Sequence, residues 1–478
     1  MKSIILQMHE QLINGEKTPI DFVNDSIEKI NAIKHTNSVV LDTFSFAKTN
    51  AELLNKEINN NKDNLLFGIP YAMKDSICTK GIVTTGGSMF LKDFIPPYSA
   101  TIFSLLNDSK TIMMCKSNLD EFGMGGTGLY SAFGHVKNFH NLKSIVGGSS
   151  SGSTNLVAAS AVPFAIGTDT GDSARRPPSF AGVVGFKPTY GLISRYGVLP
   201  YAPSLDHVGI ITRTVADAAI VSEHLIKYDE KDFTSQKIAD TQFFKNIKIK
   251  NKLTVGVVKH IENYLSADVL KVYLEAIDLI KANGHTIKYV SFDEKLLQAV
   301  HAIYYAITYS EANSCWANLT GITFGSNFGG QNFDDIIEKA RTKNLGNQIK
   351  RRYTIGQYIT KKENFETIFL HSQKMRRLLA NQWNNDLASV DTIMCAGASS
   401  TAPLIEDVLA GKPSSTYADD LLCVANFTGT PSIAIPCCKI HGMPVGLNFN
   451  CRQFEDQKAF DIALTFEELF EKKWGSNE

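Results

Sequence analysis

The order of apolar and polar positions along the chain predicts an α/β protein. Apolar residues recur at helical spacing within residues 1–60, which we expect to form a peripheral N-terminal helical layer. Short apolar runs predict strands, the clearest at 65–77, 111–115, 163–166, 253–258, 286–290, 393–395, 432–436 and 445–449. A helical pattern at 267–283 separates two of these runs, and this β-α-β order favours a sheet covered by helices.

A second helical region, from residue 294 to about 376, interrupts the strands. A polar, lysine-rich stretch at 228–252 predicts a surface connection rather than a core element. We therefore expect residues 61–478 to form a single compact domain with a helical insertion at about 294–376.

Composition excludes some functions. Lys and Arg number 48 and Asp and Glu also 48, which gives no electrostatic case for direct nucleic-acid binding. No apolar run approaches the ~20 residues that span a bilayer. Polar residues appear too early for a signal peptide, so we expect a cytoplasmic protein with no membrane contact. The eight cysteines form no C-x-x-C pair, which predicts buried free thiols and no metal site.

Two Ser/Gly-rich loops, Gly147–Ser153 and Gly167–Ser173, flank an Ala-rich apolar run. The second loop leads to a predicted helix start at Ala174–Pro177, where orphan N–H groups can bind an anion. Neither loop has the Gly-Lys-Ser/Thr of a P-loop or the G-x-G-x-x-G of a dinucleotide site. A G-x-S-x-G match centred on Ser150 follows the mostly polar residues 138–143, so we interpret it as chance.

These loops resemble the amidase signature family, whose pattern is G-G-S-S-G-G-S, an Ala-rich helix, then G-(S/T)-D-T-G-G-S-I-R-x-P-A. The chain departs from it at four positions, namely Ser151 and Asp172 for Gly, Ala174 for Ile and Pro178 for Ala. Further matches lie at residues 68–75, 116–126, 131–134, 185–191 and 204–209. The resemblance implies an α/β/α fold with a large mixed sheet covered by helices.

The family hydrolyses amides with a Ser–Ser–Lys arrangement, because a serine hydroxyl needs a base to take its proton. Matching positions imply that Ser173 is the nucleophile, Ser149 the bridging serine and Lys74 the base. The resemblance also implies a cis peptide bond at Gly148–Ser149. The candidate oxyanion hole consists of three backbone N–H groups, those of Gly171, Asp172 and Ser173.

Lys74 lies near the end of a strand-like run, where a lysine commonly extends to solvent. Its apolar neighbours and the family's G-x-P-x-x-x-K-D pattern favour burial instead. Because burial disfavours the charged ammonium, we expect a lowered pKa and a neutral Lys74 that can act as a base.

Asp172 would place a carboxylate near the developing oxyanion, where it would oppose the negative charge. The same segment carries Arg176 after the family-matching Arg175. We expect Asp172 to pair with Arg176, or otherwise with Arg175, so that its charge is held away from the oxyanion.

Within the family, the resemblance is closest to the glutaminase subunits of aminoacyl-tRNA amidotransferases, and it covers nearly the whole chain. Residues 350–356 resemble their K-R-R-x-x-x-G segment and residues 417–420 their Y-x-x-D segment. Arg352 is thereby expected to bind the α-carboxylate of glutamine and Asp420 its α-ammonium. We also assign substrate contacts to Thr170, Tyr304 and Gly125, with Arg351 and Tyr305 as open alternatives.

The resemblance implies hydrolysis of glutamine through a glutamyl-enzyme ester. It also implies a heterotrimer with the B and C subunits of the amidotransferase. The ammonia would pass to the B subunit, which holds Glu-tRNA(Gln) and uses ATP and magnesium to make Gln-tRNA(Gln), while the C subunit packs around this chain. The chain itself is expected to hold no cofactor and no metal. Two alternatives stay open, a stand-alone amidase acting on other small amides and a non-catalytic scaffold subunit, the latter favoured by Asp172 beside the nucleophile.

Overall fold

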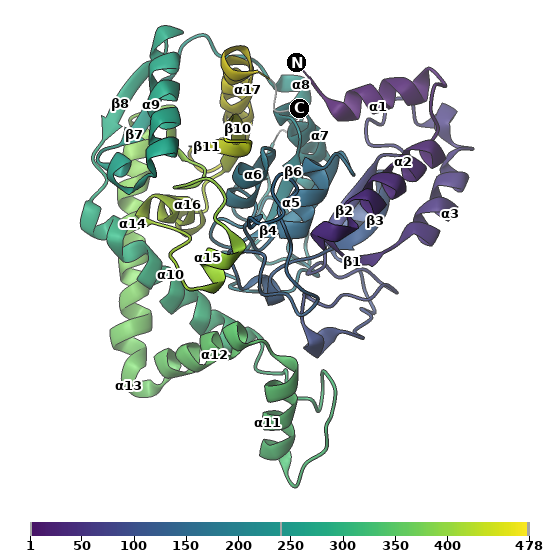
Figure 1. Cartoon of the computed structure of the whole chain (residues 1–478), viewed down its shortest axis with the longest axis vertical. Helices are drawn as coiled ribbons and strands as arrows, with labels where there is room; N and C mark the ends of the chain where they lie inside the picture. Colours follow the sequence, from purple (N-terminus) through teal and green to yellow (C-terminus); the bar gives the residue numbers. More distant parts are fainter. Residues whose placement is uncertain (1, 240, 476–478) are drawn as a thin grey trace.

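A computed structural model describes residues 2–239 and 241–475 and has one 11-stranded sheet at its centre (Figure 1). The strand order is β1-β3-β2-β4-β6-β5-β10-β11-β9-β7-β8. The strands are β1 (Val39–Asp42), β2 (Pro70–Lys74), β3 (Ile112–Ser117), β4 (Phe164–Asp169), β5 (Val184–Lys187), β6 (His207–Thr212), β7 (Thr254–Val258), β8 (Thr286–Val290), β9 (Thr392–Ala396), β10 (Ser432–Ile440) and β11 (Met443–Asn450). Parallel pairs such as β2–β4 and antiparallel pairs such as β4–β6 both occur, so the predicted mixed α/β architecture is confirmed.

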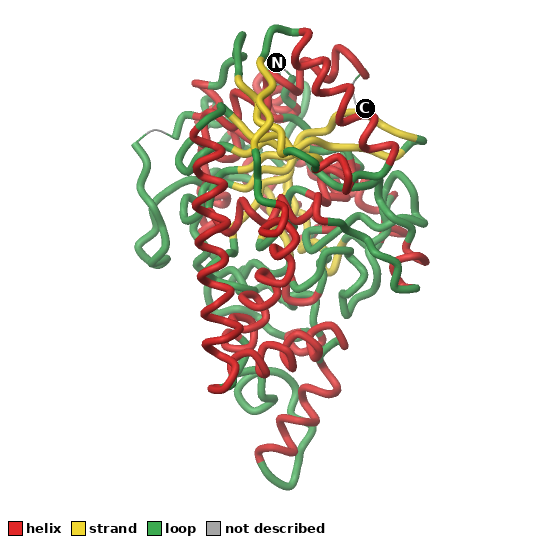
Figure 2. The backbone as a smooth tube through the Cα atoms, turned by 90° about the vertical axis from the view of Figure 1, so that its left-hand side faces the viewer, coloured by secondary structure: helices red, strands yellow, loops and turns green. Residues whose placement is uncertain are grey.

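The strands gather in the upper part of the molecule, with helices around them (Figure 2). The helices before residue 250 are α1 (Ile4–Ile13), α2 (Pro19–Ala32), α3 (Phe44–Leu54), α4 (Thr101–Asp108), α5 (Ser151–Ala158), α6 (Arg176–Ala181), α7 (Val215–Leu225) and α8 (Phe243–Asn246). The later ones are α9 (Ala267–Ala282), α10 (Glu294–Cys315), α11 (Phe333–Asn344), α12 (Asn347–Thr360), α13 (Lys362–Asn364), α14 (His371–Ala388), α15 (Ile405–Leu409), α16 (Tyr417–Thr428) and α17 (Asp456–Trp474). Single 3-10 turns include η3 (Met89–Leu91) and η4 (Glu121–Gly123), and a π-helical turn, η6 (Phe365–Leu370), precedes α14.

The two faces of the central strands enter different apolar clusters, because successive side chains of a strand point to opposite sides. Tyr71 of β2 and Phe164 of β4 face one cluster and stack with ring centroids 5.3 Å apart. Their neighbours Ala72 and Ala165 face the other. The first cluster is closed by α4, α7 and α17, and the second by α2, α3 and α5, so helices cover both faces of these strands.

Helices α10 to α14 occupy the region where the sequence predicted helices, and they extend from the lower end of the molecule with α11 furthest out (Figure 1). A separate apolar cluster lies where this extension meets the rest of the chain. It joins Phe122 and Tyr201 to Trp316, Ile349 and Tyr353 of the helical segment. Phe122 and Trp316 pack with ring centroids 4.4 Å apart, so the end of α10 packs against the stretch after β3, and Ile349 and Tyr353 bring α12 into the same cluster.

Strands β1, β5 and β6 and helix α16 are among the elements that the sequence did not predict, and β1 and α16 are the most informative. Strand β1 pairs antiparallel with β3 and joins the N-terminal helices to the edge of the sheet, although its four residues lie between helical patterns. Helix α16 covers residues for which the sequence predicted no element, and Asp419 forms a capping box with Thr416 at its start. In both places tertiary contacts decide the structure of a segment whose local pattern is weak.

All eight cysteines are free thiols, and seven of them are buried, as the sequence indicated. Among the described residues, none of the helices combines the length and apolar character that a membrane crossing needs.

Candidate active site

Lys74 is fully buried at the carboxyl end of β2. Its Nζ lies 2.8 Å from Ser149 Oγ, and the Gly148–Ser149 peptide bond is cis, as predicted. Burial lowers the pKa of Lys74 to about 7, although Asp120, Asp169 and Asp206 oppose this shift. The ammonium therefore loses its proton near neutral pH, which a general base requires.

Two further hydroxyl groups complete the surroundings of Lys74 Nζ, and sequence reasoning missed both. Ser150 Oγ lies 3.0 Å away and Thr168 Oγ1 2.8 Å away. Ser150 Oγ donates to Thr168 O at 3.0 Å, so its only proton is engaged and it must accept from Lys74. The place of Thr168 near the carboxyl end of a strand could have indicated its contact with Lys74 only if β2 and β4 were known to be parallel neighbours, whose carboxyl ends meet at one edge.

Ser173 lies on the turn between β4 and α6 and is 5% exposed. In the ranges that the structure describes, no hydrogen bond joins Ser173 Oγ to Ser149 Oγ. The expected link between the two serines is therefore not made here. Hydrogen bonds of this kind are commonly long without substrate and tighten when it binds.

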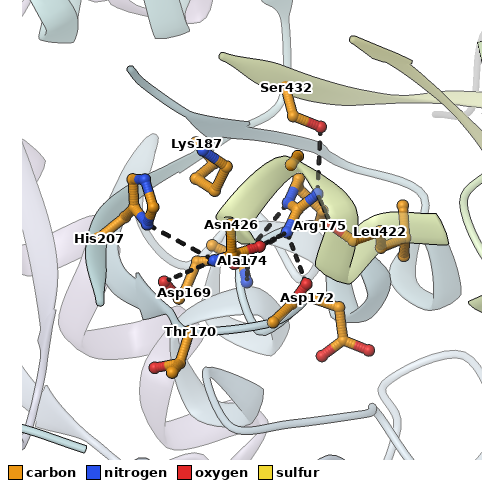
Figure 3. Close-up of polar contacts among 12 residues, drawn as sticks. Asp169, Thr170, Asp172, Ala174, Arg175, Lys187, His207, Leu422, Asn426 and Ser432 are labelled. Atoms are coloured by element: carbon orange, nitrogen blue, oxygen red, sulfur yellow. Dashed lines mark hydrogen bonds and ion pairs between the residues drawn. The ribbon is translucent and has the colours of Figure 1, made fainter. Parts of the chain in front are cut away.

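A buried ion pair holds the turn that carries Ser173 (Figure 3). Arg175 donates from Nη2 to Asp169 Oδ1 at 2.9 Å and from Nε to Asp169 Oδ2 at 3.0 Å. Arg175 Nη2 also donates to the Gly171 carbonyl at 2.8 Å and to Asn426 Oδ1 at 2.7 Å. Although burial opposes it, Arg175 lowers the pKa of Asp169, so the pair stays charged. Because the Gly171 carbonyl accepts a hydrogen bond from Arg175, the ion pair also holds the backbone of the turn in place.

Asp172 pairs with Arg176, as predicted. Arg176 Nε lies 2.7 Å from Asp172 Oδ2, and Arg176 Nη2 donates to the Gly126 carbonyl at 3.0 Å. Burial raises the pKa of Asp172 to about 6, against the opposing effect of Arg176. A Cβ on Gly126 would lie 2.6 Å from Arg176 Nη2, so only glycine leaves room for the guanidinium.

The backbone N–H groups of Gly171, Asp172 and Ser173 donate to no other group in the described part of the chain. Free donors on a rigid turn are what an oxyanion hole needs. Thr170, which we assigned to the substrate, instead donates from Oγ1 to Asp206 Oδ1 at 2.6 Å. Through this hydrogen bond Thr170 helps to hold the turn in place.

A pocket of about 240 Å³ opens beside this turn, with Gly171 and Asp172 in its wall. Of the five residues assigned to substrate binding, Thr170 lies outside the lining and four contribute to it, namely Gly125, Tyr304, Arg352 and Asp420. Tyr304 lies close to the turn, since a Cβ on Gly171 would be 3.1 Å from its ring. The pocket thus connects the candidate oxyanion hole to the predicted amino-acid contacts.

Arg352 enters the pocket from α12 among aromatic rings. Its Nη1 donates to Tyr201 Oη at 2.6 Å, and its Cζ lies 5.0 Å from the ring centroid of Tyr309. No carboxylate pairs with Arg352 among the described residues, and its Nε is buried without a hydrogen-bond partner there. A planar cation held by π faces and left without a counter-ion is suited to a carboxylate ligand. Arg351 also lines the pocket but is exposed.

Asp420 faces the pocket from the first turn of α16 and is 8% exposed. Its Oδ1 lies 3.3 Å from His301 Nδ1, and burial raises its pKa. The neighbouring Asp419 is engaged in structure, because its carboxylate accepts from Thr416 N at 2.7 Å and Ser399 N at 3.1 Å. Asp420 is therefore the acid that remains open to an ammonium group.

Asp120 organises the glycine-rich wall of the pocket, a role that sequence reasoning missed. Its carboxylate accepts from the backbone N–H groups of Thr127, Gly128 and Tyr130 at 3.2, 3.0 and 2.9 Å. A Cβ on Gly148 would lie 2.0 Å from Asp120 Oδ2, so the glycine before Ser149 is required by this close approach. Within the described ranges, no group of three or more His, Cys, Asp or Glu side chains is arranged to hold a metal ion.

Comparison with known proteins agrees with this geometry. The family model described as Amidase matches residues 21–460, and the chain belongs to the amidase family. Among its relatives is the A subunit of the glutamyl-tRNA(Gln) amidotransferase of Mycoplasma genitalium, 44% identical over 98% of this chain and 99% of the relative. The protein of the same name from Mycoplasma pneumoniae is 42% identical over 98% and 99%.

A solved structure of the A subunit of glutamyl-tRNA(Gln) amidotransferase from Thermotoga maritima shares the fold, with a TM-score of 0.77 and 30% identity. It covers 96% of this chain and 93% of its own. The similarity therefore extends over the helical segment α10–α14, which carries Arg352, as well as over the sheet.

Proposed function

We propose that this chain is the glutaminase subunit of an aminoacyl-tRNA amidotransferase, which hydrolyses glutamine to supply ammonia for converting Glu-tRNA(Gln) to Gln-tRNA(Gln). The observation that carries the proposal is the pocket between the Gly171–Asp172 turn and the unpaired Arg352. Its two ends match the two parts of glutamine, a reactive amide and a charged amino-acid group.

In the proposed reaction, Ser173 Oγ attacks the amide carbon of glutamine. Its proton passes to Ser149 Oγ, and the proton of Ser149 passes to neutral Lys74. The Lys74–Ser149 distance of 2.8 Å and the lowered pKa of Lys74 support this route. The two N–H groups of neutral Lys74 can then donate to Ser150 and Thr168, which directs its lone pair towards Ser149.

The tetrahedral intermediate carries an oxyanion, which the free N–H groups of the Gly171–Ser173 turn would stabilise by about 2.7–4 kcal/mol per donor. The carbon–nitrogen bond then breaks, and the proton held by Lys74 returns through Ser149 to the leaving nitrogen to give ammonia. Water attacks the resulting ester by the same proton route and releases glutamate and free Ser173.

Arg352 and Asp420 would bind the α-carboxylate and α-ammonium of glutamine. Both line the pocket, and among the described residues neither pairs with an oppositely charged side chain of fixed charge, since the one ion pair of Asp420 there is with His301. A charged substrate group could therefore replace the water lost on burial of each residue. A small neutral amide would gain nothing from this pair of contacts.

The proposal includes two partners, the B and C subunits of the amidotransferase, because the relatives are named as subunits of such an enzyme. The B subunit would hold Glu-tRNA(Gln) and use ATP and magnesium, and the C subunit would pack around this chain. The balanced charge of the chain agrees with tRNA being held elsewhere. We expect this chain to carry no cofactor and to work in the cytoplasm.

One experiment tests the nucleophile. Ser173→Ala in the full chain, with any copurified partners, should abolish release of ammonia from glutamine, because no other group supplies the acyl acceptor. An electrophilic glutamine analogue should label the unchanged protein on Ser173. Retained turnover in the variant would reject the assignment, and an unchanged protein without any amidase activity would favour a scaffold role.

A second experiment tests the substrate. Arg352→Lys and Asp420→Asn should each raise KM for glutamine at least about tenfold, the loss expected for a hydrogen bond between charged groups. Reaction with butyramide, which lacks both charged groups, should change less than about twofold. Arg377→Gln, an exposed arginine outside the pocket, is the matched control. Equal losses on both amides would favour a stand-alone amidase of broader specificity.

A further inference from the structure

Glu121 is a buried acid that the proposed reaction does not use. It lies in the turn η4 directly after Asp120 and is 3% exposed. Its Oε1 accepts from Ser88 Oγ at 2.5 Å, and its Oε2 accepts from the backbone N–H of Gly346 at 2.9 Å. Both oxygens therefore have partners, and one of them lies 225 residues away along the chain.

Gly346 is the N-cap residue of α12. The helix has no side-chain cap of its own and no acidic residue in its first turn. An uncapped helix start leaves N–H groups unsatisfied and favours a nearby negative charge. Glu121 supplies that group from a distant part of the chain. A Cβ on Gly346 would lie 2.5 Å from Glu121 Oε2, so the glycine makes the contact possible.

The same helix carries Arg352 into the pocket, less than two turns beyond Gly346. The turn that carries Glu121 leads to Gly125, which also lines the pocket. The contact between Glu121 and Gly346 therefore joins two segments that line the pocket. The position of Arg352 relative to the candidate oxyanion hole depends on that joint.

We propose that Glu121 is a positioning residue for substrate recognition, which holds the start of α12 and thereby sets Arg352 at the correct distance for the amino-acid end of the substrate. This inference rests on the proposed role of Arg352. Burial raises the pKa of Glu121 to about 7, against the opposing effects of Ser88, the Gly346 amide and Lys350. Near neutral pH the acid is partly protonated, and a neutral glutamine side chain would keep the same acceptor oxygen.

The test compares glutamine with butyramide in the full chain with any copurified partners. Glu121→Ala should raise KM for glutamine about tenfold while kcat/KM for butyramide changes less than about twofold. Glu121→Gln should restore glutamine KM to within about twofold of the unchanged protein. Gly346→Ala pushes the carboxylate away from the helix start and should reproduce the defect of Glu121→Ala. If Glu121→Ala fails to fold, the glutamine KM of Gly346→Ala tests the proposal in its place.

Glu467 is the matched control, because it is also a buried acid that accepts from a backbone N–H at the start of a helix. It is buried, and its Oε1 accepts from the N–H of Val215 at the start of α7 at 2.9 Å, with no pocket residue on that helix. Glu467→Ala should lower stability and leave glutamine KM unchanged. An unchanged glutamine KM in Gly346→Ala and Glu121→Ala, or a loss shared equally by butyramide, would overturn the inference. Arg352→Lys in the same assay separates the two proposals. If Arg352→Lys raises glutamine KM selectively while the Glu121 and Gly346 variants do not, the proposed role of Glu121 is rejected and that of Arg352 stands.

Discussion

At the scale of single residues, the site depends on groups whose charge the protein has altered. Lys74 shows this most clearly, because burial lowers its pKa to about 7 while three aspartates favour its charged form. The unfolded chain would hold a charged lysine at that pH. The folded protein thus supplies a base where the amino acid alone would supply a cation.

The first prediction concerns the pH dependence of that base. Since Lys74 must be neutral to accept a proton, kcat/KM for glutamine should rise with pH and level off above about 7. Below that value it should fall about tenfold per pH unit. Steady-state ammonia release from pH 5.5 to 9 measures this profile.

Lys74→Arg should be inactive throughout that range, because a guanidinium stays protonated. Measurable turnover in this variant, or a profile flat between pH 6 and 8, would show that another group removes the proton.

The second prediction concerns Asp172, whose carboxylate is held by Arg176 at 2.7 Å. Arg176→Gln leaves Asp172 without its cation beside the candidate oxyanion hole, and at a pH where the carboxylate remains ionised it should lower kcat by about ten- to a hundredfold, less than the full loss of an oxyanion donor. Adding Asp172→Gly removes that charge and should recover most of the activity. Steady-state kinetics of the two single variants and the double variant measure the coupling.

Arg377→Gln, an exposed change of the same chemistry, serves as the control. A double variant no better than Arg176→Gln would mean that Arg176 matters through the Gly126 carbonyl, to which it also donates, rather than through Asp172.

At the scale of elements, the pocket forms where strand ends meet a separate group of helices. Parallel β2 and β4 bring Lys74 and Thr168 to one edge, and the turn after β4 presents Ser173. Helices α10, α12 and α16 then supply the opposite wall. The distance between reacting groups and recognition groups is therefore set by helix packing.

The third prediction tests this packing at Gly356, where α12 crosses α10. A Cβ there would lie 2.1 Å from the Tyr309 carbonyl oxygen, so Gly356→Ala must separate the helices. We expect a loss of about 1–3 kcal/mol in the free energy of unfolding, the range for overpacking. Glutamine KM should rise because Arg352 moves with α12. Denaturant unfolding and steady-state kinetics measure the two effects.

Gln357→Ala, on the exposed side of the same helix, should change neither quantity. If Gly356→Ala proved as stable and as active as that control, α10 and α12 would not constrain each other in solution.

At the scale of the whole molecule, hydrogen bonds join the N-terminal segment to the rest of the chain at two places. Strand β1 pairs with β3 at the sheet edge. At the other end, the carboxylate of Asp217 on α7 accepts from Ser3 Oγ at 2.5 Å and from Ile5 N at 3.0 Å. The first sixty residues and the rest of the chain thus share hydrogen bonds and apolar clusters, which favours one cooperative folding unit.

The fourth prediction follows from that arrangement. Asp217→Ala leaves the N–H groups at the start of α1 without their acceptor and should cost about 1–3 kcal/mol of stability in a single unfolding transition. Activity below the transition should be unchanged, since α1 contributes nothing to the pocket lining. Urea unfolding followed by circular dichroism measures both the loss and the number of transitions.

Asp268→Ala, an exposed acid in the first turn of α9, provides the comparison. Two separated transitions in the Asp217 variant would mean that the N-terminal layer unfolds independently of the sheet.

The local pattern of the chain predicted many of the elements, and its short motifs supplied the candidate catalytic residues. Strands β7 and β8 and helix α9 agree with their predicted ranges to within one residue at each end, because their apolar spacing is strong. Lys74, Ser149 and Ser173 were identified from short motifs, since each motif is continuous in sequence. Local spacing could not reveal that Thr168 contacts Lys74 or that Thr170 donates to Asp206, because each of these contacts joins separate segments.

Only the tertiary structure decided the charges and distances of the site. Desolvation, which sets the pKa of Lys74, depends on every segment that covers the residue and is not a property of the residue itself. The contacts Asp169–Asn426 and Glu121–Gly346 join residues 257 and 225 positions apart. No local pattern encodes such pairs, because they form only when packing of the apolar faces brings distant segments together.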